Sequence, residues 1–305
     1  MKLGKLRRRQ GGVIDRRGQT PIGGGMAMPR GMGMPIPGRG GIGIGTVVLI
    51  LLLVFVVPRC LGSSDGSLIP DPGAVNGFPD ARGNGTSQVD PTDPTGAFVD
   101  AVGDDVQITW QEVFDGANRQ YRPTVIVLFH GSTNTGCGIG NADTGPFYCP
   151  LDQRVYLDAG FFNELEDRFH ASGDFAEAYV IAHEIGHHIQ NLLGITTEVD
   201  RASQQDPGLA NELSIRLELQ ADCLAGVWGH SANERGVLEP GDLQEAITAA
   251  EAVGDDRIQS SVNGRIDPES WTHGSSEQRS RWLQQGFDAG NMQSCNTFSV
   301  PFDQL

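Results

Sequence analysis

The chain has 305 residues, 38% of them hydrophobic, and a formal net charge of −16. The charge is unevenly distributed: residues 1–40 contain nine Lys or Arg and one acid, a net charge of +8, so the remainder carries −24. An acidic surface of this kind repels phosphate backbones, which argues against nucleic acid as a partner. The length suits one folded unit of roughly 200 residues together with segments that do not fold.

The first forty residues have the composition of a disordered segment. Between residues 11 and 45, Gly, Pro and Met alternate with little else and form no periodic apolar face. We therefore predict a disordered basic arm over residues 1–40.

An apolar run follows the arm. No charged residue occurs from Gly41 to Val57, and Arg39 and Arg59 lie on either side. A bilayer crossing needs about 17 to 25 such residues. A signal peptide is the alternative, but its basic region is seldom this long, and no small-residue cleavage site follows closely. We predict one uncleaved transmembrane helix over residues 41–58. The excess of Arg and Lys before it predicts a cytoplasmic N-terminus and an extracytoplasmic main body.

A linker and an α+β domain are expected next. Turn-forming sequences such as PDPG and DPTDPTG indicate a flexible linker over residues 59–95, and order is expected over residues 96–305. The β-branched run at 124–130 predicts a buried strand, and the alternating RVYLD at 154–158 predicts an edge strand. Helical patterns dominate the later part. The predicted helices cover residues 97–114 with a break inside, 161–169, 174–193, 211–228, 243–253 and 276–287.

Five cysteines accompany this organisation. Cys137 and Cys149 bracket a Gly-rich loop, Cys223 and Cys295 lie in the later half, and Cys60 follows the apolar run. Four cysteines allow three pairings, which sequence alone does not resolve. We take Cys137 with Cys149 and Cys223 with Cys295 as the working pairing, in an oxidising compartment.

The helix predicted over residues 174–193 contains an HExxH motif formed by His183, Glu184 and His187. Four residues advance a helix by slightly more than one turn, so both imidazoles project from one face and can bind the same metal ion. The carboxylate of Glu184 lies beside them, where it can take a proton from a zinc-bound water and pass it to the leaving amine. The motif also occurs by chance, and its place in an apolar helix favours the functional interpretation.

A catalytic zinc needs a third protein ligand and one open position. Glu218, on the next predicted helix, is the best candidate, and Asp222 follows it by four residues on the same helix face. Asp222 can then accept the ring N–H of a zinc-bound histidine and hold its orientation. The alternative is that both are surface acids of an acidic protein. Two His and one Glu suit one Zn²⁺ per chain, with another divalent ion as the alternative.

In combination these motifs resemble zincins in which HExxH is followed by ExxxD on a second helix. Five further segments are GPFYCPLD at 145–152, VYLD at 155–158, AHEIGHHIQ at 182–190, ELQADCLAG at 218–226 and WTHGSSEQR at 271–279. Through these segments the chain is more specifically similar to the bacterial family described as "putative neutral zinc metallopeptidase". The resemblance extends from about residue 97 to 300 and implies a zincin-like α+β domain, with a small sheet and an edge strand over two metal-binding helices. It also implies a single-pass protein of the bacterial cell membrane with an outward peptidase domain.

Residues 272–279 are also similar to a TH-P-x-x-x-x-R element of membrane-associated zinc peptidases, with Gly274 in place of the proline. By that resemblance His273 donates to the oxyanion of the tetrahedral intermediate, and Arg279 orients substrate or neighbouring carboxylates. The alternative is structural: His273 caps the following helix, and Arg279 pairs with an acid.

Together these features predict a zinc metallopeptidase, an endopeptidase that cleaves peptide or protein substrates outside the cytoplasmic membrane. A catalytically silent zincin-fold binding module of the cell envelope is the alternative, and the presence of Glu184 argues against it because a binder needs no general base. A peptidoglycan amidase or another zinc hydrolase shares the chemistry but uses other ligand spacings. An extended substrate is expected to pair with the edge strand around Tyr156.

Overall fold

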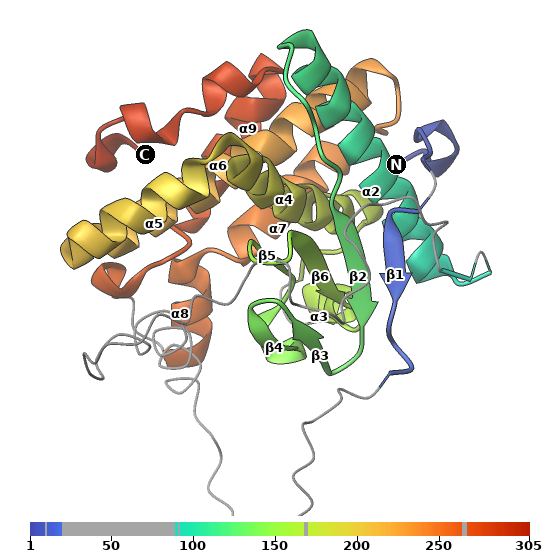
Figure 1. The fold of residues 1–305 in the computed structure, drawn as a ribbon, viewed down its shortest axis with the longest axis horizontal. Coiled ribbons are helices and arrows are strands. Elements are labelled where there is room, and N and C mark those ends of the chain that lie inside the picture. Colours follow the sequence, from blue (N-terminus) through green and yellow to red (C-terminus); the bar gives the residue numbers. More distant parts are fainter. Residues whose placement is uncertain (10, 20–88, 91, 168–169, 264–266) are drawn as a thin grey trace, which may run out of the picture. The chain divides into compact units, whose positions relative to one another are not determined.

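Figure 1 shows the fold of the computed structural model, which describes residues 1–9, 11–19, 89–90, 92–167, 170–263 and 267–305. The transmembrane helix predicted over residues 41–58, and residues 59–88 of the predicted linker, lie outside the described residues. None of the helices in the described ranges combines the length and the apolar character that a membrane crossing requires.

The described fold contains a four-stranded sheet. Its first three strands run parallel, and the last runs antiparallel to its neighbour at the edge (Figure 1). In spatial order the strands are β1 (Val13–Asp15), β2 (Val125–Phe129), β6 (Arg154–Asp158) and β5 (Phe147–Cys149). A separate antiparallel hairpin consists of β3 (Ser132–Thr135) and β4 (Gly138–Asn141).

The prediction that RVYLD forms an edge strand is wrong. All five residues of β6 are buried, because the strand lies between β2 and β5. The acid at its end has internal partners: Asp158 accepts hydrogen bonds from the backbone N–H of Gly131 at 2.6 Å and of Gly160 at 2.7 Å. The alternation of polar and apolar residues therefore does not reflect a solvent-facing side, and the edge position belongs to β5.

The helices follow the predicted order, and the class is α+β. Five of them correspond to predicted segments beyond residue 160, whereas the segments 195–205 and 255–263 were not predicted to be helical. The α-helices are α2 (Pro94–Gly116), α3 (Phe161–Asp167), α4 (Asp174–Leu193), α5 (Ile195–Gln205), α6 (Ala210–Glu234), α7 (Asp242–Ala252), α8 (Asp255–Asn263) and α9 (Ser276–Ala289). Short 3₁₀ turns are η1 (Leu3–Lys5), η3 (Ala142–Thr144), η4 (Pro207–Leu209), η5 (Pro268–Ser270), η6 (Met292–Cys295), η7 (Thr297–Ser299) and η8 (Phe302–Gln304).

Helix α2 is continuous, whereas the sequence predicted a break in it. Gly103 lies near its middle, where an added Cβ would come within 2.5 Å of the Ile126 side chain on β2. The glycine therefore allows α2 to lie close against the sheet without interrupting the helix. The side chain of Asp93 caps the helix by accepting from the backbone N–H of Gly96, so α2 begins slightly before the helix predicted from residue 97.

Helices α4 and α6 approach closely at Gly186, inside the HExxH motif. A Cβ added to Gly186 would lie 3.1 Å from the carbonyl oxygen of Ala221 on α6. A larger residue here would push the two helices apart, because a packed interface has no free volume to absorb it. This contact brings the histidine-bearing face of α4 next to α6.

The segment 1–19 differs from the disordered arm predicted over residues 1–40. It contains η1 and β1, and β1 pairs with β2 in register from Val13↔Ile126 to Asp15↔Leu128. Met1 and Leu6 are also buried, at 8% and 6% exposure. The prediction rested on the overall composition and charge of the first forty residues, and neither property shows that a three-residue strand here can add to the edge of a distant sheet.

Two disulfide bonds join the predicted cysteine pairs. Cys137 is bonded to Cys149 with a Cα–Cα distance of 5.8 Å, and Cys223 is bonded to Cys295 at 5.5 Å. The first attaches the β3–β4 hairpin to the edge strand β5, and the second attaches α6 to η6. The working pairing is confirmed, and Cys223 is not free to act as a thiolate ligand.

Candidate functional site

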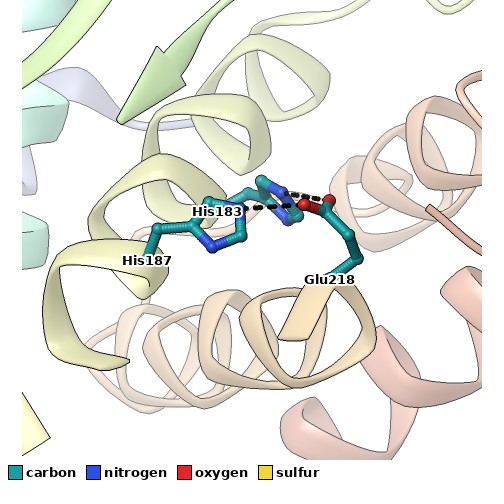
Figure 2. A group of neighbouring side chains, drawn as sticks. All are labelled: His183, His187 and Glu218. Atoms are coloured by element: carbon teal, nitrogen blue, oxygen red, sulfur yellow. Dashed lines mark ion pairs between the residues drawn. The ribbon is translucent and has the colours of Figure 1, made fainter. Parts of the chain in front are cut away.

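Two imidazoles from α4 and one carboxylate from α6 converge (Figure 2). His183 Nε2 lies 3.3 Å from Glu218 Oε2, and His187 Nε2 lies 3.4 Å from Glu218 Oε1. One possible ligand atom from each of the three residues lies within 4.8 Å of the others. The side chain of His187 is 19% exposed and that of Glu218 17%, so the group is partly accessible to solvent. The structure thus brings together the three residues predicted to bind the metal.

The second ring nitrogen of each histidine has its own acceptor. His183 Nδ1 lies 2.8 Å from Asp222 Oδ1, and His187 Nδ1 lies 2.9 Å from Gln190 Oε1. An acceptor at Nδ1 keeps a proton there, so Nε2 is the nitrogen that can bind a metal. The Gln190 amide in turn donates to a backbone carbonyl of α6 at 2.7 Å. Sequence reasoning found Asp222 and missed Gln190, although its spacing of three residues from His187 places it on the same helix face.

The donor set fits zinc. Two imidazole nitrogens and one carboxylate, with a fourth position open, form one of the known ligand sets of catalytic zinc sites. Zinc would be held by the Nε2 atoms of His183 and His187 and by the carboxylate of Glu218. Acceptors behind both histidines are the usual complement of such a site, since they orient the rings and increase their basicity.

The charges of these groups favour binding of a cation. Burial lowers the pKa of His183, but the carboxylates of Asp222 and Glu218 outweigh that effect and raise it to about 10. Burial raises the pKa of Glu218, yet the two imidazoles hold it well below its ordinary value. Without a metal, the ring of His183 therefore carries a second proton, whose charge offsets that of the carboxylates. A metal ion that binds at Nε2 must displace that proton.

Asp222 lies at the centre of a buried network. Arg279 contacts it with two nitrogens, Nε to Oδ2 at 2.9 Å and an Nη to Oδ1 at 2.9 Å, and the Tyr179 hydroxyl donates to Oδ1 at 2.6 Å. Asp222 is 0% exposed and Arg279 4%. The structure therefore places Arg279 on a neighbouring carboxylate, one of the roles anticipated for it. Tyr179 was not anticipated, although it precedes His183 by four residues on the same helix face.

Glu184 is buried on the same helix, at 7% exposure. Burial raises its pKa, while the charges of His183 and His187 act to lower it. A carboxylate whose pKa is raised toward neutral can both accept and release a proton, which is the property required of a general base that later acts as an acid.

His273 lies beside this cluster and has an acid partner. Its side chain is 42% exposed, and its Nδ1 lies 3.1 Å from Asp255 Oδ1. Burial acts to lower the pKa of His273, but the hydrogen bond to Asp255 and the charge of Glu218 outweigh it and raise the pKa above its ordinary value. The ring is therefore within electrostatic reach of the metal ligand Glu218. The N-cap of α9 is Ser275, which excludes the alternative that His273 caps this helix. Asp255 was missed because it belongs to α8, which the sequence did not predict.

The edge strand β5 is joined to the HExxH helix. Tyr148 on β5 donates its hydroxyl to His188 Nδ1 at 3.0 Å and accepts from the Asn191 amide at 3.0 Å. His188 Nε2 donates to the carbonyl oxygen of Arg122 at 2.7 Å, and burial lowers the pKa of His188 to about 4. His188 is 0% exposed. It therefore holds the edge strand against α4 as a neutral ring.

Comparisons with known proteins identify the family of this chain. The model of the family described as "Putative neutral zinc metallopeptidase" matches residues 2–298. The chain is 47% identical over 229 residues to the uncharacterized protein YpfJ of Escherichia coli K12, which covers 74% of this chain and 79% of YpfJ. It is 46% identical over 211 residues to the uncharacterized protein Rv2575 of Mycobacterium tuberculosis H37Rv, which covers 66% and 69% of the two chains. No solved structure matches the chain. Because the family match extends over nearly the whole sequence and includes His183, His187 and Glu218, the chain belongs to the putative neutral zinc metallopeptidase family.

Proposed function

We propose that the protein is a zinc-dependent endopeptidase in which His183, His187 and Glu218 bind one Zn²⁺ and Glu184 is the general base. The observation that carries the proposal is the arrangement of ligand atoms: two Nε2 atoms face one carboxylate, and each Nδ1 is held by a separate acceptor. Zinc, when bound, supplies Lewis acidity, since it makes water acidic near neutral pH and polarises the scissile carbonyl.

The protein's own groups then handle the proton. Glu184 takes one proton from the attacking water as its oxygen bonds to the carbonyl carbon, and delivers that proton to the departing amine nitrogen as the C–N bond breaks. His273 donates a hydrogen bond to the oxygen on which negative charge develops. Arg279 acts indirectly and does not contact the substrate in this proposal. Its two contacts with Asp222 hold the carboxylate that orients His183.

The substrate in this proposal is an extended peptide or protein segment. β5 is at the edge of the sheet, so its outer backbone groups can pair with an added strand. The contact between Tyr148 and His188 holds that edge at a fixed position relative to the metal ligands. We therefore propose β5 as the strand that the substrate pairs with, in place of the strand around Tyr156 expected from the sequence.

The proposed location is outside the cytoplasmic membrane. Two disulfide bonds support it, since disulfides persist in oxidising compartments. Attachment to the bacterial cell membrane through residues 41–58 is part of the same proposal and rests on the apolar composition of that run. Such attachment does not depend on whether this run crosses the bilayer.

The test compares wild type with Glu184→Gln and, as a control, Glu198→Gln, which changes an exposed acid on α5. Metal content is measured by mass spectrometry, and cleavage is followed on an unfolded protein substrate. We expect one zinc per chain in all three proteins, and a rate reduced by about 10²-fold or more in Glu184→Gln alone. Zinc binding without cleavage by wild type would instead support the silent binding module, and full activity of Glu184→Gln would disprove the general-base role.

A further inference from the structure

The segment 1–19 is a structural part of the metallopeptidase domain. β1 adds to the sheet as a parallel strand beside β2 (Figure 1). Backbone hydrogen bonds extend the pairing at both ends, from the Ile126 N–H to the Gly12 carbonyl at 2.8 Å and from the Arg16 N–H to the Leu128 carbonyl at 2.7 Å. Val13 is 1% exposed. The pairing therefore includes both backbone and core contacts.

Arginines of the same segment neutralise acids of α2. Arg7 Nε donates to Asp105 Oδ1 at 3.1 Å, and Arg8 donates to Asp100 at 2.6 Å. Asp100 is 8% exposed and Asp105 0%. Acids in the middle of a helix are rarely buried unless they are paired. Asp105 is also paired with Arg235 of the domain, at 2.8 and 2.7 Å, so it is the pairing of Asp100 that indicates a surface of α2 covered by residues 1–19.

Docking of residues 1–19 restricts how the chain can be arranged across a membrane. A single membrane crossing over residues 41–58 would separate residues 1–19 from residues 92–305 by a hydrocarbon layer about 30 Å thick. Strand pairing requires backbones about 5 Å apart, so β1 could not pair with β2 in that arrangement. The docked segment and a single crossing exclude each other.

We propose that residues 1–19 lie on the same side of the membrane as the metallopeptidase domain. The charge rule that predicted a cytoplasmic N-terminus counts every Lys and Arg before the apolar run. In the fold, Arg7, Arg8 and Arg17 are each paired with an acid between residues 93 and 105, so part of the basic charge of the segment is complemented by the domain it docks on. Both ends of the connection between residues 19 and 92 then lie in one compartment.

Single-cysteine labelling of the full-length protein in cells tests this. Cys60→Ser removes the one cysteine outside the two disulfides, and Leu3→Cys or Leu209→Cys then adds a reporter to the segment or to the domain. Leu3 and Leu209 are matched in exposure, at 44% and 43%. Spheroplasts are treated with a membrane-impermeant maleimide before and after lysis.

We expect both reporters to react to the same extent before lysis. Labelling of Leu209→Cys alone before lysis, with Leu3→Cys reacting only afterwards, would overturn the proposal. If neither reporter reacts until lysis, the shared compartment is upheld and the proposed extracytoplasmic location is wrong, so the two conclusions fail separately.

Docking itself is tested in the purified full-length protein with Val13→Asp. Burying a carboxylate at this position should lower the Tm by roughly 5–10 °C if β1 is docked. Leu3→Asp, on the exposed part of the same segment, should leave the Tm unchanged. Equal Tm values for Val13→Asp and wild type would show that β1 is not docked and would remove the basis for the shared compartment.

Discussion

Asp222 Oδ1 lies 2.8 Å from His183 Nδ1, and the same carboxylate is contacted by two nitrogens of Arg279. A fully buried acid would otherwise carry a large desolvation cost. Here Arg279 compensates the negative charge of Asp222. The lone pairs of Asp222 Oδ1 determine the orientation of the His183 imidazole. The candidate metal centre is thus positioned by residues such as Asp222 and Arg279, which are not themselves metal ligands.

Replacing Asp222 should therefore weaken metal binding without removing a ligand. Asp222→Asn keeps the shape of the side chain but loses the charge that favours the Nδ1 proton of His183 and pairs with Arg279. We expect zinc affinity to fall by about 10- to 100-fold. Competition with a chromophoric chelator measures the affinity, and Asp206→Asn, at an exposed site beyond α5, is the control. Unchanged affinity would show that Asp222 does not support the metal.

Gln190 should have the same kind of effect through the other histidine. Gln190→Met keeps most of the side-chain volume and removes the oxygen that lies 2.9 Å from His187 Nδ1. We expect zinc affinity to fall by about tenfold or more, because the ring loses the partner that selects its tautomer. The same chelator competition measures the loss, with Gln205→Met at the exposed end of α5 for comparison. An affinity equal to that of wild type contradicts the assignment.

Asp255 should affect turnover and leave the metal in place. It accepts from three consecutive backbone N–H groups over residues 272–274, at 2.7, 2.7 and 3.2 Å, and also contacts the His273 ring. Asp255→Asn weakens the hold on that ring, so kcat should fall by about 10- to 100-fold while zinc content stays at one per chain. Steady-state kinetics and metal analysis are compared with His273→Ala. If Asp255→Asn in the His273→Ala background lowers kcat further by the same factor, Asp255 does not act through His273.

The sequence predicted the metal site more fully than its surroundings, for physical reasons. HExxH depends on one helix, whose turn length alone places both imidazoles on one face, and the spacing of Glu218 and Asp222 depends on one other helix. Gln190 and Tyr179 were within reach of the same argument, at three and four residues from the histidines. Asp255 was not, because its contact with His273 depends on how α8 packs beside α9.

The fold, too, was predictable where one element decides the outcome and not where packing between elements does. An apolar pattern at helical spacing identified α4, the cap formed by Ser275 identified the start of α9, and the β-branched run identified β2. The place of β6 in the interior of the sheet could not be read from its alternation, since Asp158 satisfies its carboxylate with loop N–H groups. β1 is three residues long within a Gly-rich segment, and only its pairing with β2, more than a hundred residues away, makes it a strand.

The docked N-terminal segment predicts a specific pH dependence of stability. Burial raises the pKa of Asp104 to about 6; the charge of Asp100 adds to this effect, while the Arg9 N–H and the charges of Arg8 and Arg9 oppose it. The folded state therefore holds a proton that the unfolded state, with a carboxyl pKa of 3.8, releases earlier. Between pH 4 and pH 6 the folded state binds more protons, so the free energy of unfolding should decrease as pH rises, by at most about 3 kcal/mol.

Asp104→Asn should abolish this part of the pH dependence, because an amide does not titrate and can still accept from the Arg9 N–H. Urea unfolding of wild type and variant at intervals from pH 4 to pH 7 measures the difference, with Asp115→Asn, an exposed site on the same helix, as the control. The gain in stability of Asp104→Asn over wild type should grow with pH through this window and level off above it. Asp105 does not obscure the effect: although burial acts to raise its pKa, Arg235, Arg7 and Trp228 lower it below the ordinary value, so its contribution is lost only at more acidic pH. Parallel curves for wild type and Asp104→Asn would mean that Asp104 is already solvated, and that residues 1–19 do not cover α2.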